Sequence, residues 1–304
     1  RLKTDKDGRF SATVAGDTVI AMSGKTQGII RLSGISPRPS GEGTIELVVD
    51  SASYARDKLT TSLGGLTLAV DLAYDEPTDT ITIAAFRGES QEFGTIKGAA
   101  KAMLRGDMPW SASLSAASID FAKLWAVARP FLPDEYRAWT VQGAGAVETQ
   151  ADGTLGNGRS GLNSAVTLSF AQGGFSSPDS TRAAQGVNGA VILEVAQVAP
   201  RQKWAVTVRA EQRDGEYLWG KYYTYLAGRR ASLTIDGDYF LGGARGFELN
   251  GVLDLFQTGD YSFHASGIGG DWAIRFKGAD VSHARIVETL LKEYLVGLSP
   301  NLAS

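Results

Sequence analysis

Two histidines are the only side chains of this sequence whose ordinary pKa lies near neutral pH. His264 lies between Ser262 and Ser266, so that a serine–histidine pairing is conceivable, and His283 follows Ser282. No nucleophile-elbow motif accompanies either histidine, and no third catalytic group is evident. The chain has no cysteine, which removes thiolate ligands, thiol nucleophiles and disulfides. We therefore predict surface histidines in a protein that is not an enzyme and has no metal site and no cofactor.

Three short strings resemble ligand-binding loops. Gly156–Gly161 fits the dinucleotide fingerprint, but that fingerprint requires a following helix, and residues 162–170 have the composition of a strand. Gly24-Lys25-Thr26 resembles the end of a phosphate-binding loop, yet its leading glycine is replaced by Val19. Residues 5–8 resemble the start of a calcium loop without its later ligands. We predict that all three are ordinary turn, strand or terminal segments.

An aromatic cluster forms the last candidate site. The side chains could stack on a sugar, line the rim of an apolar groove, or close the edge of a sheet. Asp214 and Glu216 are nearby carboxylates that a carbohydrate-binding or hydrolytic site could use. The cluster contains Tyr217, Trp219, Tyr222, Tyr223 and Tyr225.

The stretch from Arg230 to Lys277 gives the clearest structural pattern. Apolar and polar residues alternate in segments such as Ala231–Asp236 and Phe247–Phe256, which places each set on one face of a strand. Short connections rich in Gly and Asp separate the segments and are typical of hairpin turns. The pattern predicts an antiparallel meander with one apolar and one polar face.

The remainder of the chain repeats this pattern, with three predicted helices between the strands. Residues 97–105 are rich in alanine and are predicted to be helical. A second helix is expected to begin at the N-cap Asp120 and to end near Arg129, before Pro130 and Pro133. A third helix is expected to begin at the N-cap Ser282 and to carry an apolar stripe up to Leu295.

Composition narrows the possible partners. The chain has 304 residues and a formal net charge of −3, and we find no basic stripe, which argues against nucleic-acid binding. No apolar run approaches the roughly 20 residues needed to span a bilayer. Because the sequence begins at Arg1 without an initiator Met, we expect a segment of a longer protein or a processed form.

One stretch near the middle of the chain carries a resemblance to a known protein family. Residues 114–124 lead into the helix that ends at Pro130-Phe131-Leu132-Pro133, and Val141-Gln142-Gly143-Ala144-Gly145 then opens a strand. This arrangement resembles the AsmA-like proteins, a group that includes the TamB and YdbH types. The resemblance covers residues 113–295 and extends more weakly towards the N-terminus.

The resemblance implies an envelope protein of bacteria, located in the periplasm and anchored in the inner membrane through a segment outside this chain. Such a module would bind glycerophospholipid acyl chains and help to move lipid between the inner and outer membranes, with possible envelope protein partners. We expect a mainly β fold: an elongated, twisted antiparallel sheet curled into an open groove, with two or three short helices. Residues 1–135 would form a first run of strands ending in a helix. Residues 136–304 would form a meander ending in a capping helix, and the two parts could form one continuous groove.

The apolar face is the predicted lipid-binding surface, because two or three short helices are too few to cover so many strands. Its side chains would contact acyl chains collectively. The residues placed on it are Leu66, Leu68, Val70, Val166, Leu168, Val191, Leu193, Val206, Val208, Leu233, Ile235, Leu249, Leu253, Phe263 and Ile274.

Two other functions remain open. A structural or adhesive β-sandwich would bury the apolar face completely. A carbohydrate-binding or hydrolase β-domain would use the aromatic residues from Trp219 to Tyr225 with Asp214 and Glu216.

Overall fold

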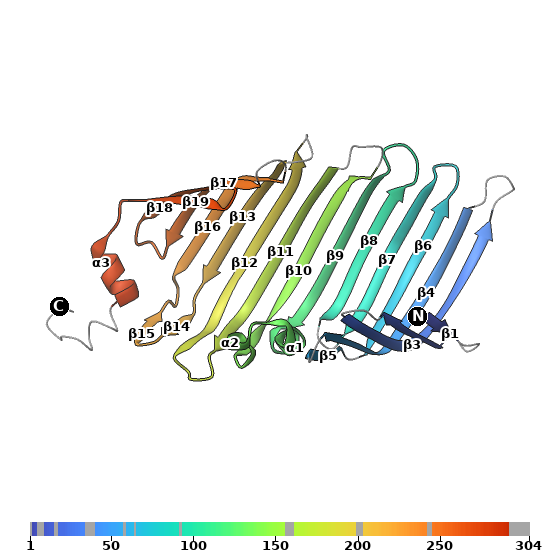
Figure 1. Cartoon of the computed structure of the whole chain (residues 1–304), viewed down its shortest axis with the longest axis horizontal. Coiled ribbons are helices and arrows are strands. Elements are labelled where there is room, and N and C mark those ends of the chain that lie inside the picture. The colour runs from blue at the N-terminus through green and yellow to red at the C-terminus, as the bar shows by residue number, and fades with distance from the viewer. Residues whose placement is uncertain are drawn as a thin grey trace. The chain divides into compact units, whose positions relative to one another are not determined.

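The structure is a computed structural model that is mainly β, with a large open antiparallel sheet and three short α-helices (Figure 1). It describes residues 2–4, 9–14, 18–33, 40–56, 59–63, 65–90, 93–155, 161–198, 203–241 and 245–291. The predicted fold class is therefore confirmed. The chain divides into two compact units, which we describe separately: unit 1 contains residues 1–137 and 146–160, and unit 2 contains residues 138–145 and 161–304. The predicted boundary between residues 135 and 136, and one groove along the whole chain, stay predictions.

Unit 1 is built from consecutive antiparallel strands that pair with their neighbours in the sequence, except that β6 pairs with β4, and β5 pairs with another part of β4. Pairing continues from β9 to the second part of β10, which both units share. The strands are β1 (Leu2–Thr4), β2 (Arg9–Val14), β3 (Thr18–Ser33), β4 (Ser40–Arg56), β5 (Leu59–Leu63), β6 (Leu66–Asp75), β7 (Thr80–Ser90), β8 (Gly94–Met103), β9 (Pro109–Asp120) and β10 (Thr140–Thr154).

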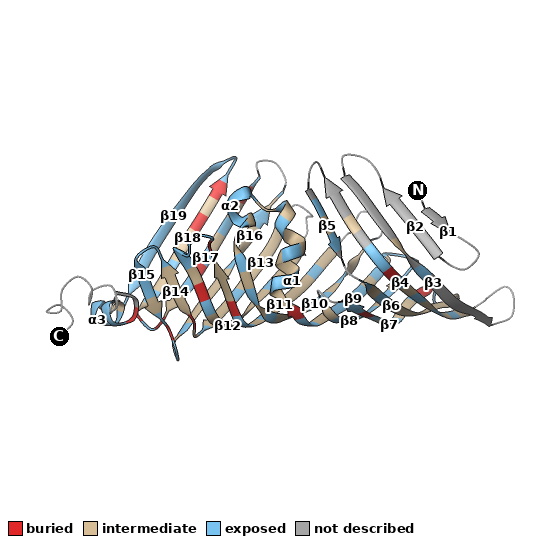
Figure 2. Cartoon of the chain, turned by 90° about the horizontal axis from the view of Figure 1, so that it is seen from below, coloured by how far each residue is buried: buried red, intermediate tan, exposed pale blue. Residues whose placement is uncertain are grey.

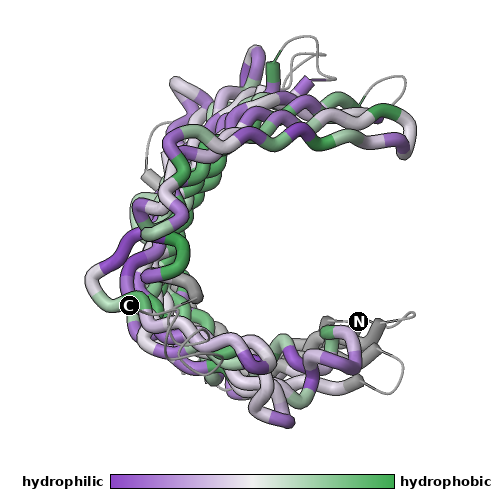
Figure 3. Tube along the Cα trace, turned by 90° about the vertical axis from the view of Figure 1, so that its left-hand side faces the viewer, coloured by the Kyte–Doolittle hydropathy of each residue, from purple (hydrophilic) through white to green (hydrophobic). Residues whose placement is uncertain are grey.

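Unit 2 continues the same meander with one departure. Strand β13 pairs with β16, while the small hairpin of β14 and β15 pairs with the first residues of β12. Figure 3 colours the backbone trace by hydropathy and shows hydrophobic and hydrophilic residues interspersed along it. The strands are β11 (Gly161–Ser176), β12 (Arg182–Val198), β13 (Lys203–Arg213), β14 (Glu216–Trp219), β15 (Tyr222–Tyr225), β16 (Arg230–Phe240), β17 (Gly246–Leu255), β18 (Asp260–Ile268) and β19 (Asp271–Ala279).

The helices begin where their sequence signals predict. The Asp120 carboxylate accepts hydrogen bonds from the backbone N–H groups of Ala122 (2.9 Å) and Lys123 (3.2 Å) at the start of α1 (Phe121–Ala128). The Ser282 hydroxyl accepts one from the backbone N–H of Arg285 at the start of α3 (His283–Ile286). The 3₁₀ turn η1 (Arg129–Phe131), the one-turn helix α2 (Asp134–Arg137) and the π-helical turn η2 (Val287–Leu291) complete the set. The predicted end of the second helix near Arg129 is confirmed, whereas residues 292–295 of the last stripe lie outside the described residues.

One predicted helix is wrong. Residues 97–103 belong to strand β8 and pair with both β7 and β9. Its residues alternate between partly buried positions such as Ile96 and Ala100 and exposed positions such as Lys97 and Lys101. The helix propensity of alanine is a weak preference, and pairing on both sides of the strand overrides it.

The buried core is small for a chain of this size. Among the described residues, the buried apolar side chains are Val49, Ile119, Ala184, Leu226, Phe256 and Ala265. The chain exposes 19248 Å² to solvent, whereas a compact monomer of this mass exposes about 12,000 Å². Most strand residues are therefore partly exposed on both faces of their sheet.

Candidate apolar binding face

The strand register of unit 2 gathers apolar residues into rows. Directly opposed residues of antiparallel strands point to the same face, so each row crosses the sheet on one side. Three neighbouring rows cross β11, β12, β13, β16, β17, β18 and β19, and together we call them the apolar face of unit 2. The rows are Val166, Leu193, Val208, Ile235, Gly251, Phe263 and Phe276; Leu168, Val191, Ala210, Leu233, Leu253, Tyr261 and Gly278; and Ser164, Val195, Val206, Gly237, Leu249, Ala265 and Ile274.

All twelve residues predicted for this half of the chain lie in these three rows. The predicted list of lipid-binding residues omits members of the same rows, such as Tyr261 and Phe276, although the alternation in the sequence includes them. A fourth row, beyond Gly237 and Leu249, is largely aromatic and was also missed: Trp204, Tyr239, Phe247 and Trp272.

The opposite face of the same strands is mostly polar. One of its rows contains Ala165, Glu194, Thr207, Asp236, Asn250, His264 and Arg275, in that order. Partly exposed ion pairs join Arg209 to Glu194 (3.0 Å) and Lys203 to Asp238 (3.0 Å) on this face. We call it the polar face of unit 2.

None of the fifteen predicted residues is buried. Leu193 is 37% exposed and Ile274 is 57% exposed, while the other thirteen are partly exposed. Figure 2 shows the same pattern, with few buried residues along the strands of unit 2. An apolar face of this extent exceeds the single scattered apolar residues that are normal on a protein surface.

Large side chains of the apolar face lie across glycines of the neighbouring strand. A Cβ atom added to Gly251 would come 2.1 Å from the ring of its partner Phe263, and one added to Gly189 would come 2.6 Å from the ring of Phe170. A third case is Gly237, beside the side chain of Leu249. These side chains therefore lie flat and make a thin apolar layer on the sheet.

Unit 1 has the same two-faced construction on a smaller scale. Leu66, Leu68 and Val70 of β6 share a face with residues directly opposite them on β4 and β7. One row of this face contains Ile45, Val70, Phe86, Gly98 and Leu114, whereas a row of the opposite face contains Glu46, Ala69, Arg87, Lys97 and Ser115. The three predicted residues of this half therefore lie together on an apolar face of unit 1.

The described helices do not cover the centre of the apolar face of unit 2. In this unit η2 lies beside β15, and the α3 segment is held by polar contacts. The Arg285 guanidinium donates to the carbonyl oxygen of Gln257 (3.0 Å), and that of Arg229 donates to the hydroxyl of the buried Thr289. In unit 1, α1 lies beside β5 and β9.

The other candidate residues take no part in a catalytic arrangement that the structure describes. His264 Nδ1 lies 3.0 Å from Asn250 Oδ1 on the polar face, and His283 opens α3. Gly24-Lys25-Thr26 lies inside strand β3. Residues 5–8 and 156–160 lie outside the described residues. Within the described ranges, no group of His, Cys, Asp and Glu is arranged to hold a metal ion, and no helix is long and apolar enough to cross a membrane.

The aromatic cluster is divided between the two faces of the β14–β15 hairpin. Tyr217 opposes Thr224, and Trp219 opposes Tyr222, on one face. Leu218 opposes Tyr223, and Glu216 opposes Tyr225, on the other face. Burial raises the pKa of Tyr217, and the guanidinium of Arg182 lies 4.9 Å above the Trp219 ring. The predicted single aromatic site is therefore two different surfaces.

Comparison with models of protein families, with curated proteins and with solved structures gave no match to this chain.

Proposed function

We propose that this protein binds the acyl chains of glycerophospholipids on the apolar face of its open sheet and helps to move lipid between two membranes. The role is one of binding without catalysis. Phospholipid is the proposed ligand, and nucleic acid is not a proposed partner. Neither a cofactor nor a metal ion is needed for it.

One observation carries this proposal. Three apolar rows cross seven strands of unit 2, and apart from the small Ala265 their side chains remain at least partly exposed, with no described helix over their centre. Apolar surface in contact with water costs about 25 cal/mol per Å², so such a face favours an apolar cover. An acyl chain fits because it needs no hydrogen bonds and can lie along a flat apolar layer.

The resemblance of residues 113–295 to the AsmA-like proteins supports the cellular setting of the proposal. It favours a location in the periplasm, anchorage in the inner membrane by a segment outside this chain, and contact with other envelope proteins. Lipid would then travel between the inner and outer membranes.

A structural or adhesive β-sandwich has less support. A sandwich buries both inner faces at about 10 Å separation, and its inward side chains lose contact with water. The side chains of the apolar rows of unit 2 keep contact with water apart from the small Ala265, and the edge residue Phe276 is 62% exposed.

Photo-crosslinking tests the proposal directly. The purified protein is incubated with vesicles that contain a phosphatidylethanolamine carrying a diazirine at the end of one acyl chain, and the crosslinked peptides are mapped. We expect the crosslinks at apolar-face residues of β13, β16 and β17, such as Val208, Ile235 and Leu253. Crosslinks confined to polar-face residues such as Arg209 or Val252, or none at all, would contradict acyl-chain binding on this face.

A further inference from the structure

A line of backbone irregularities crosses the strands at one end of unit 2. Gln172 (φ 51°) and Asp214 (φ 57°) have left-handed backbone conformations that non-glycine residues seldom adopt. Gly143, Gly186 and Gly215 have positive φ angles on the neighbouring strands and connections. Register shifts in the β11–β12 pairing fall at the same level. Bulges of this kind turn side chains to new directions and are frequent beside binding sites.

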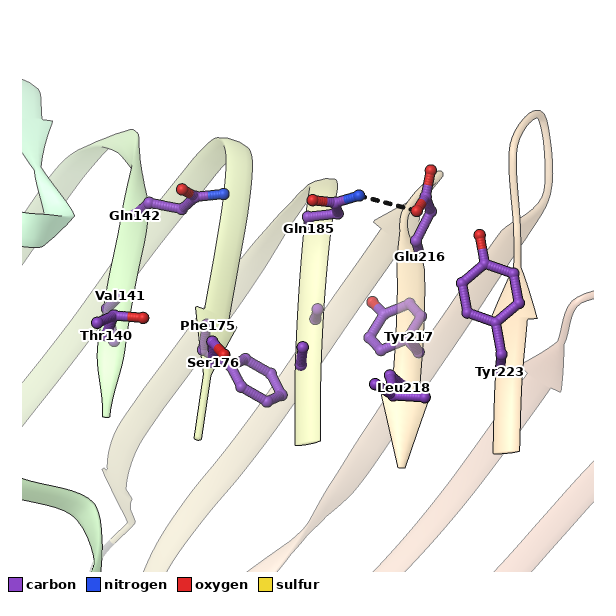
Figure 4. Close-up of a pocket in the computed structure, with 12 residues that line it drawn as sticks. Thr140, Val141, Gln142, Phe175, Ser176, Gln185, Glu216, Tyr217, Leu218 and Tyr223 are labelled. Carbon is purple, nitrogen blue, oxygen red and sulfur yellow. Dashed lines mark hydrogen bonds between the residues drawn. The ribbon is translucent and has the colours of Figure 1, made fainter. Parts of the chain in front are cut away.

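Two adjoining depressions follow this line. The larger has a volume of about 720 Å³ and the smaller about 420 Å³, and they share Gln142, Gln185 and Glu216. Both volumes fall within the range of about 300–1,000 Å³ found for small-molecule sites. Figure 4 shows Gln142, Gln185 and Glu216 at one level of the smaller depression, with Tyr217 and Tyr223 beside them.

The lining of the larger depression is rich in groups that both donate and accept hydrogen bonds. Its residues include Gln142, Gln172 and Gln185, whose carboxamides donate and accept, together with Asp214 and Glu216, whose carboxylates accept only; no Lys or Arg is among the described lining residues. Gln185 Nε2 donates to Glu216 Oε2 (2.8 Å), and Asp214 Oδ1 accepts from the backbone N–H of Gly228 (2.7 Å). Carboxamides and hydroxyl groups match in donor and acceptor character, whereas two carboxylates without a cation disfavour an anionic ligand.

An aromatic side chain stands beside these polar groups. The register places Gln185, Glu216 and Tyr225 in one row on the same face. Tyr225 is 58% exposed and lines the larger depression, and Tyr223 lines the smaller one. A tyrosine ring offers an apolar face to the C–H side of a sugar, while nearby carboxamides and carboxylates bond its hydroxyl groups. From this combination we infer that the larger depression binds an uncharged glycan.

The larger depression is separate from the acyl-chain face, whereas the smaller one is lined by residues of both faces. Ala184 opposes Phe175 on one side and Tyr217 on the other, and these three residues lie on the face that continues from Val187 and Val191. Gln185 is the next residue after Ala184 in a regularly paired segment and so points to the opposite face. A glycan and an acyl chain can therefore be bound at the same time.

Titration with two soluble neutral oligosaccharides, N-acetylchitotetraose and maltotetraose, tests the inference by isothermal calorimetry and saturation-transfer NMR. We expect the protein to bind at least one of them. Tyr225→Ala and Gln185→Ala should each weaken that binding by about fivefold or more, because each removes a central contact of the depression. Lipid that co-purifies with these variants should stay at the wild-type level.

Tyr222→Ala is the matched control, since it makes the same change in the same hairpin on the opposite face. Its binding should stay within about twofold of the wild type. Both tyrosines are exposed, so both variants should fold, which circular dichroism checks. The inference is overturned if the wild type binds neither oligosaccharide, or if Tyr222→Ala weakens binding as much as Tyr225→Ala does.

Discussion

The two faces of unit 2 are formed by the same strands, but they differ in whether their side chains are stable in contact with water. On the polar face, charged groups pair with each other or meet water, as Arg209 and Glu194 do. On the apolar face, side chains such as Leu253 contact their row neighbours and remain partly exposed. A hydrated polar face needs nothing further, whereas an exposed apolar face gains free energy from any apolar cover. Adjacent residues of one strand point to opposite faces. The same substitution at two adjacent residues therefore tests whether a face is needed for lipid binding, while its effect on stability is measured separately.

The largest difference in bound lipid is expected between arginine substitutions at Leu253 and Val252, which are neighbours on β17 and point to opposite faces. Leu253→Arg places a charge in the middle of the apolar rows, where an acyl chain would have to leave it unpaired. We expect bound lipid to fall by at least about tenfold. The free energy of unfolding should fall by less than about 2 kcal/mol, because the arginine stem can lie along apolar neighbours while its head reaches water.

Val252→Arg is the matched control. Val252 is 59% exposed on the polar face, so lipid content and melting temperature should stay close to those of the wild type. Lipid is measured by native mass spectrometry and stability by urea unfolding. An insoluble Leu253→Arg variant would mean that the apolar face is a buried core. A folded Leu253→Arg variant with the wild-type amount of lipid would mean that Leu253 does not contact lipid.

The second prediction concerns the thin apolar layer itself. Gly251→Ala introduces a methyl group into the space that the Phe263 ring occupies. We expect a loss of about 1–3 kcal/mol in the free energy of unfolding, as for other overpacked sites. In a Phe263→Ala background the same change should cost less, which a double-mutant cycle measures.

Gly65→Ala provides the contrast, because the nearest atom to its added Cβ is a carbonyl oxygen at 3.8 Å. This variant should be neutral or slightly stabilised. Equal losses in the two alanine variants would show that the aromatic ring does not lie flat on Gly251.

The two faces of the strands and the starts of the helices could largely be predicted from the sequence. Strict alternation in residues 230–277 identifies four strands and their faces, because a side-chain period of two has only two possible assignments. Asp120 and Ser282 mark helix starts for an equally local reason, since each side chain bonds N–H groups within its own first turn.

What the sequence could not predict depends on distant neighbours. The alanine-rich residues 97–103 form a strand because partners lie on both sides of them. The aromatic cluster looks like one site in sequence, but adjacent residues such as Leu218 and Trp219 point to opposite faces. The depression beside Glu216 follows register shifts between β11 and β12 and left-handed residues such as Gln172 and Asp214, and the pairing partners that place these irregularities side by side lie far apart in the sequence.

A smaller effect on stability is expected from a change of pH at the turn that joins β11 to β12. Hydrogen bonds from the Ser177 hydroxyl, and from the backbone N–H and hydroxyl of Thr181, lower the pKa of the Asp179 carboxyl to about 2. A lowered pKa means that the turn is stabilised above the ordinary pKa of aspartate, about 4, and loses that stabilisation as the pH falls towards 2.

We expect the amide resonance of Thr181 to titrate with an apparent pKa near 2 in NMR spectra and the turn to loosen over that range. Asp179→Asn should remove this pH dependence. An apparent pKa at the ordinary value of aspartate would mean that these hydrogen bonds do not form.

The smallest effect is expected on the polar face, at Arg209. Its guanidinium pairs with Glu194 at 3.0 Å, but both side chains are about half exposed, and such pairs contribute between about 0 and 1 kcal/mol. Arg209→Gln should therefore change the free energy of unfolding by less than about 1 kcal/mol and leave bound lipid unchanged. Val208→Gln introduces the same side chain one residue earlier, on the apolar face, and should lower bound lipid. If both variants kept their lipid, or if Arg209→Gln lost it, acyl chains would not distinguish the two faces of the sheet.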